Sequence, residues 1–295
     1  MNKNKKQFLI YRTFKIIAFT ALLCLLGIMI VLFKEGLPLF FKVDIGSFLF
    51  GKYWYPTHDP AEFGLVPLVS ATLLVTAGAT VIAIWLGLGS ALFLNELAGG
   101  KVKSFLKPLI EVLAAIPSIV YGFFGMLIVA PFLQDLLALP VGLCAFTASL
   151  ILGIMAVPTV CSLAEDALSS VPRHFKEASL ALGANRWQTL TGVLMPAAGS
   201  GIGTAIILGI SRVVGETMTV LMIAGGAAMI PTSFFDPVRP MTATIAAEMG
   251  ETVIGSTHYN ALFAIGLILF FMTLALNMLA EKISSRFRVK LGLGQ

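Results

Sequence analysis

Residues 66–94 have the sequence VPLVSATLLVTAGATVIAIWLGLGSALFL, a run of 29 residues without a single charged side chain. At a rise of 1.5 Å per residue, about 20 apolar residues form a helix that crosses a bilayer, so this run leaves room for tilt or for extension beyond the lipid. Five further runs have a similar composition: 16–33, 109–133, 140–164, 202–230 and 261–280. The sequence therefore predicts an all-α integral membrane protein with six transmembrane helices.

The composition of the whole chain agrees with this fold class. Of 295 residues, 58% are hydrophobic and 12% are charged, about half the charged share of an ordinary soluble domain, and the mean hydropathy is +0.94. A water-soluble globule is excluded. The formal net charge is +5, but the cations lie in short clusters between apolar runs, and a nucleic-acid binder would gather them in one basic stripe. We therefore expect membrane lipid and no nucleic acid as a partner.

The distribution of lysine and arginine predicts the orientation. Fifteen of these twenty residues lie in the N-terminal tail, in the loops 95–108 and 165–201, and in the C-terminal tail. Four lie in the segments of the opposite side, and Arg212 lies inside a span. The positive-inside rule then places both termini in the cytoplasm. A cleaved signal is the alternative for the first run, but its 18 apolar residues exceed a signal core and favour a retained anchor.

Two outer segments differ in character. Tyr53, Trp54 and Tyr55 lie in the segment 34–65, and such amphipathic rings favour an interfacial membrane anchor over a ligand contact. The segment 231–260 contains a helix-like stretch at 241–250. A loop of this length can receive a soluble partner or form a solvated cap, and the sequence leaves both readings open.

Cofactor motifs give no positive signal. The small residues Gly199, Gly201 and Gly203 follow no predicted strand and precede no GK[ST] sequence, so close helix packing is favoured over a phosphate-binding loop. Cys24, Cys144 and Cys161 lie in apolar runs without metal-ligand spacing. We expect no ATP site, no cofactor and no metal in this chain.

The cytoplasmic loop between the fourth and fifth runs has its own helix signals. Pro172 suits a first helical turn, Phe175, Leu180 and Leu182 interleave with charged residues, and Gly183 can end the helix in a left-handed conformation. An exposed, partly apolar helix of this kind is either a docking surface for another protein or an ordinary surface helix, and its residues alone favour neither interpretation.

Residues Glu177-Ala178-Ser179, followed by Gly183 and Pro196, resemble the EAA loop of type I ABC importer permeases. That pattern is Glu-Ala-Ala, three residues, Gly, nine residues and Ile-x-Leu-Pro, and this chain departs from it at Ser179, Val193 and Met195. The resemblance implies that residues 172–183 form a coupling helix in a groove of a separate ATPase subunit. The coupling residues would be Glu177, Ala178, Ser179, Gly183, Arg173, Phe175 and Trp187, although an interfacial anchor is an open alternative for Trp187.

Three other strings are similar to the PstC-type branch of this family, which serves phosphate import: Asp59-Pro-Ala-Glu-Phe-Gly64-Leu-Val-Pro67, Ala115-Ile-Pro117-Ser118-Ile-Val-Tyr121-Gly122 and Ser211-Arg212-Val-Val-Gly215-Glu216-Thr217-Met218. The resemblance implies a tail, a peripheral first helix and an outer loop at 1–60. It implies a five-helix, MetI-like permease core at 61–295, with the coupling loop at 165–201.

The same resemblance implies a location in the bacterial cytoplasmic (inner) membrane and a transport role without enzymatic activity. The implied partners are a second, related permease subunit (PstA-like), a dimer of ATP-binding cassette subunits (PstB-like) and an extracytoplasmic phosphate-binding protein (PstS-like). ATP and magnesium would be bound by that ATPase.

The residues Arg212 and Glu216 need a physical explanation, because a charge at the centre of a transmembrane helix costs roughly 2.5 to 3.5 kcal/mol on insertion scales. At a spacing of four residues they would share one face of a continuous helix and could form a salt bridge. A purely structural pair is one hypothesis. The sharper one is an oxyanion pathway in which the Arg212 guanidinium binds two phosphate oxygens.

Hydroxyl groups near this pair are weaker candidates for the same pathway. They belong to Ser211, Thr217, Ser118 and Tyr121, and Pro117 favours a kink in the third span toward the pore. Two rival functions stay open: a permease for another tetrahedral oxyanion such as sulfate or molybdate, and a carrier driven by an ion gradient.

Overall fold

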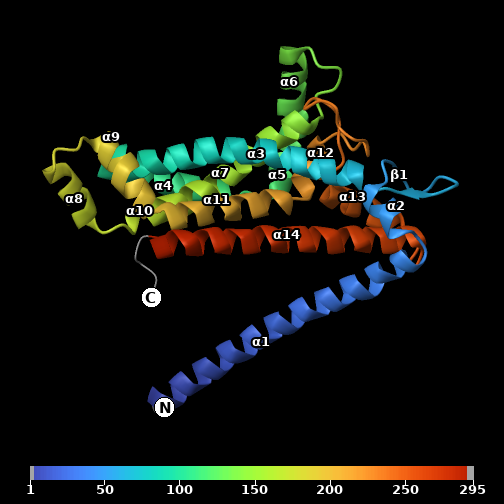
Figure 1. Cartoon of the computed structure of the whole chain (residues 1–295), viewed down its shortest axis with the longest axis horizontal. Coiled ribbons are helices and arrows are strands. Elements are labelled where there is room, and N and C mark those ends of the chain that lie inside the picture. Colours follow the sequence, from blue (N-terminus) through green and yellow to red (C-terminus); the bar gives the residue numbers. More distant parts are fainter. Residues whose placement is uncertain (1–2, 291–295) are drawn as a thin grey trace.

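The computed structural model describes residues 3–290, and its side chains are described for residues 11–279, 281 and 282. Helices dominate this part of the chain (Figure 1). The outer and first crossing elements are α1 (Lys3–Gly36), a 3-10 turn (Leu37–Phe41), α2 (Ile45–Phe50), a short antiparallel pair β1 (Trp54–Tyr55) and β2 (Glu62–Phe63), and α3 (Val66–Leu92) with a π-turn at Phe93–Leu97. Then follow α4 (Gly100–Ala115), α5 (Ser118–Phe124), a π-turn (Gly125–Val129), α6 (Ala130–Leu137) and α7 (Ala145–Ser169).

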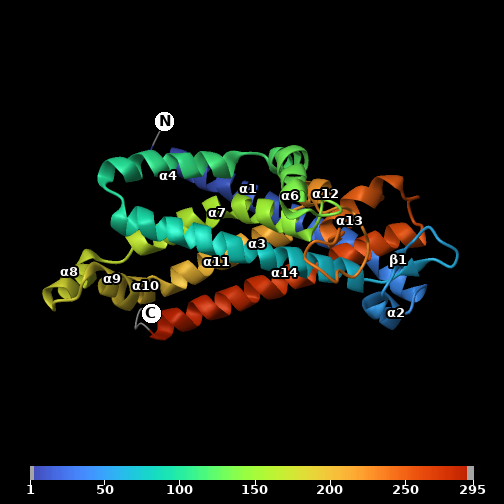
Figure 2. The same ribbon diagram turned by 90° about the horizontal axis from the view of Figure 1, so that it is seen from above.

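The second half of the chain contains the loop that carries α8 and the last crossing helices. Its elements are α8 (Arg173–Ala181), α9 (Arg186–Thr189), a π-turn (Leu190–Leu194), α10 (Met195–Ala197), α11 (Gly199–Val214), α12 (Met218–Ile223), α13 (Met241–Glu248), a 3-10 turn (Met249–Glu251) and α14 (Thr257–Lys290). Helices α3, α7, α11 and α14 lie along the long axis of the molecule, and α6 stands across it (Figure 1). Helix α1 begins and α14 ends at the end of the molecule where α8 lies (Figures 1 and 2).

The number of crossing helices agrees with the sequence prediction, whereas several boundaries do not. Five helical segments of the described chain are long and apolar enough to span a bilayer: 11–41, 66–97, 118–137, 145–169 and 257–279. The bent pair 186–197 and 199–214, whose two parts meet at 73°, makes a sixth span when its two parts are counted as one. The chain is therefore an all-α integral membrane protein.

Two predicted spans are interrupted. The run 109–133 is broken at Ile116–Pro117, so its first residues belong to α4. Pro117 has no N–H to donate and cannot continue the helix, so the expected kink is a complete break. The run 202–230 ends as a continuous helix at Val214 and resumes only for the short α12. Helix α7 continues to Ser169, so the loop expected at 165–201 begins later than residue 165.

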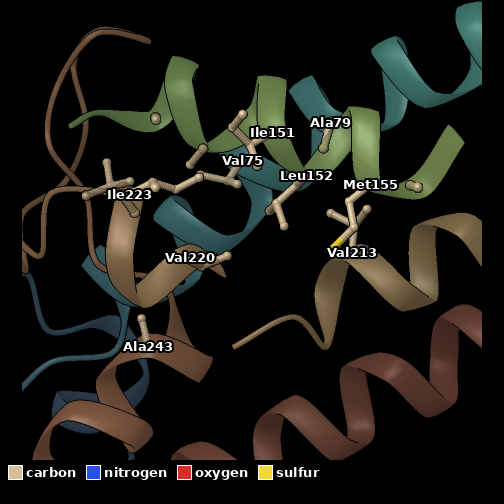
Figure 3. Packing of buried hydrophobic residues seen from close by; sticks show 14 of the residues in the cluster. Val75, Ala79, Ile151, Leu152, Met155, Val213, Val220, Ile223 and Ala243 are labelled. Carbon is tan, nitrogen blue, oxygen red and sulfur yellow. The ribbon is translucent and has the colours of Figure 1, made fainter. Parts of the chain in front are cut away.

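Close packing of small residues joins α3 to α7 at the centre of the bundle. Ala71, Val75, Ala79 and Ala83 recur every four residues on α3 and are buried against Ala148, Leu152 and Ala156 of α7. Helices α11, α12 and α13 complete this core, and Figure 3 shows Val213, Val220, Ile223 and Ala243 pointing into it. Small side chains let two backbones approach closely, which is the usual basis of helix association in lipid.

The outer loops form a second cluster in which Trp54 has an unexpected place. Its ring is only 2% exposed, and its indole Nε1 donates to both carboxylate oxygens of Glu248 at 3.1 and 3.2 Å. The expectation of an interfacial anchor is therefore wrong for Trp54, while Tyr53 and Tyr55 are exposed. The helix-like stretch expected at 241–250 is present as α13.

The α3–α7 contact predicts that glycines in α3 differ in their tolerance of a methyl group. A Cβ at Gly87 would lie 2.8 Å from Val160 Cβ, whereas a Cβ at Gly89 would meet no atom within 4 Å. We expect Gly87→Ala to destabilise the protein by about 1–3 kcal/mol through overpacking, and Gly89→Ala to be neutral or slightly stabilising. Thermal unfolding of the purified variants in detergent measures this, and equal midpoints for the two variants would contradict the close α3–α7 packing.

Candidate functional site

Two breaks in the helical backbone lie side by side inside the bundle. One lies at Ile116–Pro117 between α4 and α5, and the other lies at residues 215–217 between α11 and α12. The buried Thr219 on α12 donates its hydroxyl to the carbonyl of Ser118 on α5 at 2.9 Å. Non-helical backbone at membrane depth is tolerated only where protein surrounds it or where it lines a polar cavity.

Arg212 lies in the last turn of α11, immediately before the second break. Its side chain is exposed in this chain, and its Nη1 donates to Thr159 Oγ1 of α7 at 3.1 Å. Tyr121 of α5 is near enough for the guanidinium charge to act on its hydroxyl, although that hydroxyl donates to the Leu113 carbonyl at 2.9 Å. Arg212 and Tyr121 therefore lie in the same region as the breaks, and their sharing of one ion pathway stays a prediction.

The expected salt bridge between Arg212 and Glu216 is absent among the ion pairs of the described side chains. The reason is local: α11 ends at Val214, so Glu216 does not stand one helical turn above Arg212. The Glu216 carboxylate instead accepts from the Thr219 hydroxyl at 3.4 Å. Its carbonyl accepts from the Thr242 hydroxyl of α13 at 2.7 Å. Glu216 thus holds the second break in place.

The other predicted hydroxyls have local partners. Ser211 donates to Asn277 Oδ1 of α14 at 2.8 Å, and Thr217 donates to the Gly215 carbonyl at 3.4 Å. Ser118 contributes its backbone carbonyl to the contact with α12. The sequence interpretation missed Thr159, Thr219, Thr242 and Asn277. A polar residue such as Asn277 inside the last apolar run is the signal that could have identified them.

The loop between α7 and α11 has the helix and the helix end that its sequence predicts. Helix α8 spans Arg173–Ala181, and Gly183 has a φ of +86°, which ends the helix in the left-handed region. Arg173, Phe175, Glu177, Ala178 and Trp187 are exposed, and Ser179 Oγ lies 3.0 Å from Thr189 Oγ1. The loop therefore presents a mixed apolar and charged surface at one end of the molecule (Figure 2).

Metal and thiol chemistry find no support in the described side chains. No group of three or more His, Cys, Asp or Glu residues lies close enough there to hold a metal ion. Cys144 and Cys161 are buried free thiols, and Cys24 is exposed on α1. The described site contains a guanidinium, hydroxyls, the Glu216 carboxylate and non-helical backbone, and its guanidinium and hydroxyls are groups that can donate hydrogen bonds to an anion.

A bundle with interrupted spans and a loop helix of this kind defines a membrane permease of the ATP-binding-cassette importer class. Residues 79–289 match the model of one family, and the chain belongs to it: the binding-protein-dependent transport system inner membrane components. The protein is thus a multi-pass inner membrane transport component.

Relatives of known name support the same assignment. The chain is 36% identical to a probable ABC transporter permease protein, YqgH of Bacillus subtilis, over 89% of this chain and 86% of that one. It is 34% identical to the phosphate transport system permease protein PstC of Haemophilus influenzae, over 77% of each chain. These relatives place it with the PstC-type permeases.

Solved structures show the same fold. A chain of the MetNI methionine ABC transporter, described as inward facing, has a TM-score of 0.61 at 21% identity, covering 76% of this chain and 95% of that one. A chain of a bacterial ABC transporter that imports alginate has a TM-score of 0.66 at 15% identity and covers 96% of each chain. At this identity the likeness concerns the fold.

The exposure of Arg212 beside two backbone breaks predicts that water reaches this position. In a Cys24→Ser background, we expect a water-soluble maleimide to label Arg212→Cys, and to leave Val213→Cys unlabelled because Val213 is only 3% exposed. Mass spectrometry of protein treated in intact membranes measures both. Equal resistance of the two positions would show that Arg212 faces lipid or packed protein.

Proposed function

We propose that this chain is one permease subunit of an ATP-driven importer of inorganic phosphate. One observation carries the proposal: an exposed guanidinium, Arg212, stands inside the membrane bundle beside two facing helix breaks. A charge at this depth is costly and persists where it serves an ion pathway. The planar fork of arginine matches two oxygens of a tetrahedral oxyanion. The PstC relatives supply the substrate, phosphate.

The proposed assembly has four kinds of subunit. A second, PstA-like permease completes the pathway, a PstB-like ATPase dimer hydrolyses ATP with magnesium, and a PstS-like binding protein delivers phosphate from outside. The alginate importer of the same fold was solved with a periplasmic protein, which supports an external partner. In this assembly the chain itself catalyses no covalent reaction.

The proposed orientation follows the distribution of cations. Fifteen of the twenty lysine and arginine residues lie in the N-terminal tail, the loops 95–108 and 165–201 and the C-terminal tail. From the positive-inside rule we infer that α8 and both termini face the cytoplasm. Helix α8, with Glu177 and the exposed Phe175, then meets the ATPase. Alternating access follows when movement of the ATPases displaces α8 and the helices rock around the Arg212 region.

Replacement of the guanidinium tests the pathway. We expect Arg212→Gln to abolish phosphate uptake because the amide carries no charge, and Arg212→Lys to retain only part of it because an ammonium lacks the bidentate fork. Uptake of radiolabelled phosphate by proteoliposomes of the reconstituted complex measures this, with Arg12→Gln on the peripheral helix as a control. Normal uptake by Arg212→Gln would leave Arg212 with a structural role only.

The same assay separates the rival functions. Inhibition of uptake by excess sulfate or molybdate would indicate another oxyanion as substrate. Uptake that follows a proton gradient without ATP would indicate an ion-driven carrier. We expect neither result, because a self-sufficient carrier does not need the EAA-like loop that carries residues 172–183.

A charge reversal on the loop helix tests ATPase docking. We expect Glu177→Lys to reduce co-purification of the ATPase because it reverses an exposed charge on the proposed contact surface. Insertion in the membrane should be unchanged. Glu251→Lys, an exposed glutamate at the opposite end of the molecule, is the matched control. Undiminished ATPase recovery with Glu177→Lys would reject α8 as the docking helix.

A further inference from the structure

Glu165 is a buried carboxylate that the proposed pathway does not use. It lies near the cytoplasmic end of α7, is 1% exposed, and is the one charged residue among the buried residues of the described chain. It accepts from Lys103 Nζ at 2.5 Å, Lys107 Nζ at 2.6 Å and Ser169 Oγ at 2.7 Å. Removing a carboxylate from water costs free energy unless hydrogen-bond donors or opposite charges compensate for it. Here the three donors to Glu165 provide that compensation.

The two lysines belong to α4, which has few other attachments. Lys103 and Lys107 are one helical turn apart, on the same face as the half-buried Leu106 and Ile110. No residue of α4 is buried. The hydrogen bond that Lys107 donates to Glu165, followed by the one that it donates to Asp166, raises the pKa of Lys107 above its usual value, so this lysine stays charged. Glu165 is therefore the polar anchor that holds α4 against α7.

The anchor continues toward the loop helix through a chain of hydrogen bonds. Ser169 also accepts from Asn95 Nδ2 at 2.8 Å. The neighbouring Glu96 accepts from Lys176 Nζ of α8 at 2.6 Å. A groove of about 550 Å³ lies between the two ion pairs and is lined by Glu96, Lys103 and Lys176. The groove gives these side chains room to exchange partners.

At its other end, α4 leads directly to the first helix break. The helix ends at Ala115, one residue before Ile116–Pro117. The Tyr121 hydroxyl ties the segment after the break to the Leu113 carbonyl, and the Ser118 carbonyl is bound by Thr219. A displacement of α4 therefore shifts the backbone that faces Arg212.

We propose that Glu165, with Lys103 and Lys107, is a positioning cluster that transmits movement of α8 through α4 to the helix breaks beside Arg212. The inference rests on the proposed function and names the residues that link the loop to the pathway. Glu165 contacts neither the ion nor the ATPase; it acts by fixing where α4 stands relative to α7.

The ratio of phosphate imported to ATP hydrolysed tests the cluster. A structural defect lowers the amount of assembled complex, and both rates fall together. If only the transmission of movement from α8 is lost, ATP hydrolysis continues while phosphate import falls, so the ratio of phosphate imported to ATP hydrolysed decreases. In proteoliposomes of the complete complex we expect Glu165→Gln to lower this ratio by at least about fivefold, the lower end of coupling between distant sites. An unchanged ratio in assembled complex would overturn the proposal.

Asp166→Asn is the matched control. Asp166 also contacts Lys107, at 2.9 Å, but its side chain is 60% exposed. We expect its ratio to stay within about twofold of the unmodified protein, because an exposed pair contributes little. An effect of Asp166→Asn equal to that of Glu165→Gln would show that local net charge matters and burial does not.

Two further measurements keep the test decisive. If Glu165→Gln does not assemble, Asn95→Ala breaks the same chain of contacts at Ser169, and an unchanged ratio there overturns the proposal. The labelling rate of Ser118→Cys, with and without ATP, reports movement at the break without reference to the ion. We expect ATP to alter this rate only when Glu165 is present. If the complex does not import phosphate but ATP still alters the labelling rate of Ser118→Cys in the presence of Glu165, phosphate is not the substrate, while the proposed role of the Glu165 cluster is supported.

Discussion

A backbone carbonyl in the interior of a membrane protein needs a hydrogen-bond donor, and this requirement governs the centre of the bundle. Where α5 begins, the Ser118 carbonyl takes the Thr219 hydroxyl. Where α11 ends, the Glu216 carbonyl takes the Thr242 hydroxyl. At the first break, the Thr219 hydroxyl adds a contact between α12 and the start of α5. At the second, the Thr242 hydroxyl satisfies the Glu216 carbonyl, which belongs to no helix, and Arg212 lies beside this break with an exposed guanidinium.

The rest of the bundle provides the rigid frame for these breaks. Helices α3 and α7 approach closely through alanine and glycine, and α11 lies against both. Polar contacts are concentrated at the ends of the bundle, with Glu165 at one end and Glu248 at the other. Glu248 accepts from Trp54, Arg239 and His258, which joins three outer segments. Apolar packing therefore fixes the crossing helices, and hydrogen-bonded carboxylates fix the segments that connect them.

The sequence predicted those features that depend on length and on backbone chemistry. Apolar runs of sufficient length indicated the crossing helices, Pro117 indicated the first break, and Gly183 indicated the end of α8. The second break was not predicted: residues 215–217 contain no proline, and Gly215, which directly follows α11, gives no clear stop signal because it lies within a long apolar run. The assumed pairing of Arg212 with Glu216 failed for the same reason. The burial of Trp54 depends on Glu248, which is 194 residues away in the chain.

The first helix stands apart from the bundle. Helix α1 meets α14 near Gly36 and Phe33, where the Phe33 and Phe271 rings make an edge contact, and it diverges from α14 toward its beginning (Figure 1). The described side chains of its first half are exposed, so lipid and not the described part of this chain covers them. Such a helix acts as a membrane anchor, for which length and hydrophobicity matter more than the identity of each residue. Apolar substitutions in the first half of this helix therefore leave the packing of the adjacent helical bundle unchanged.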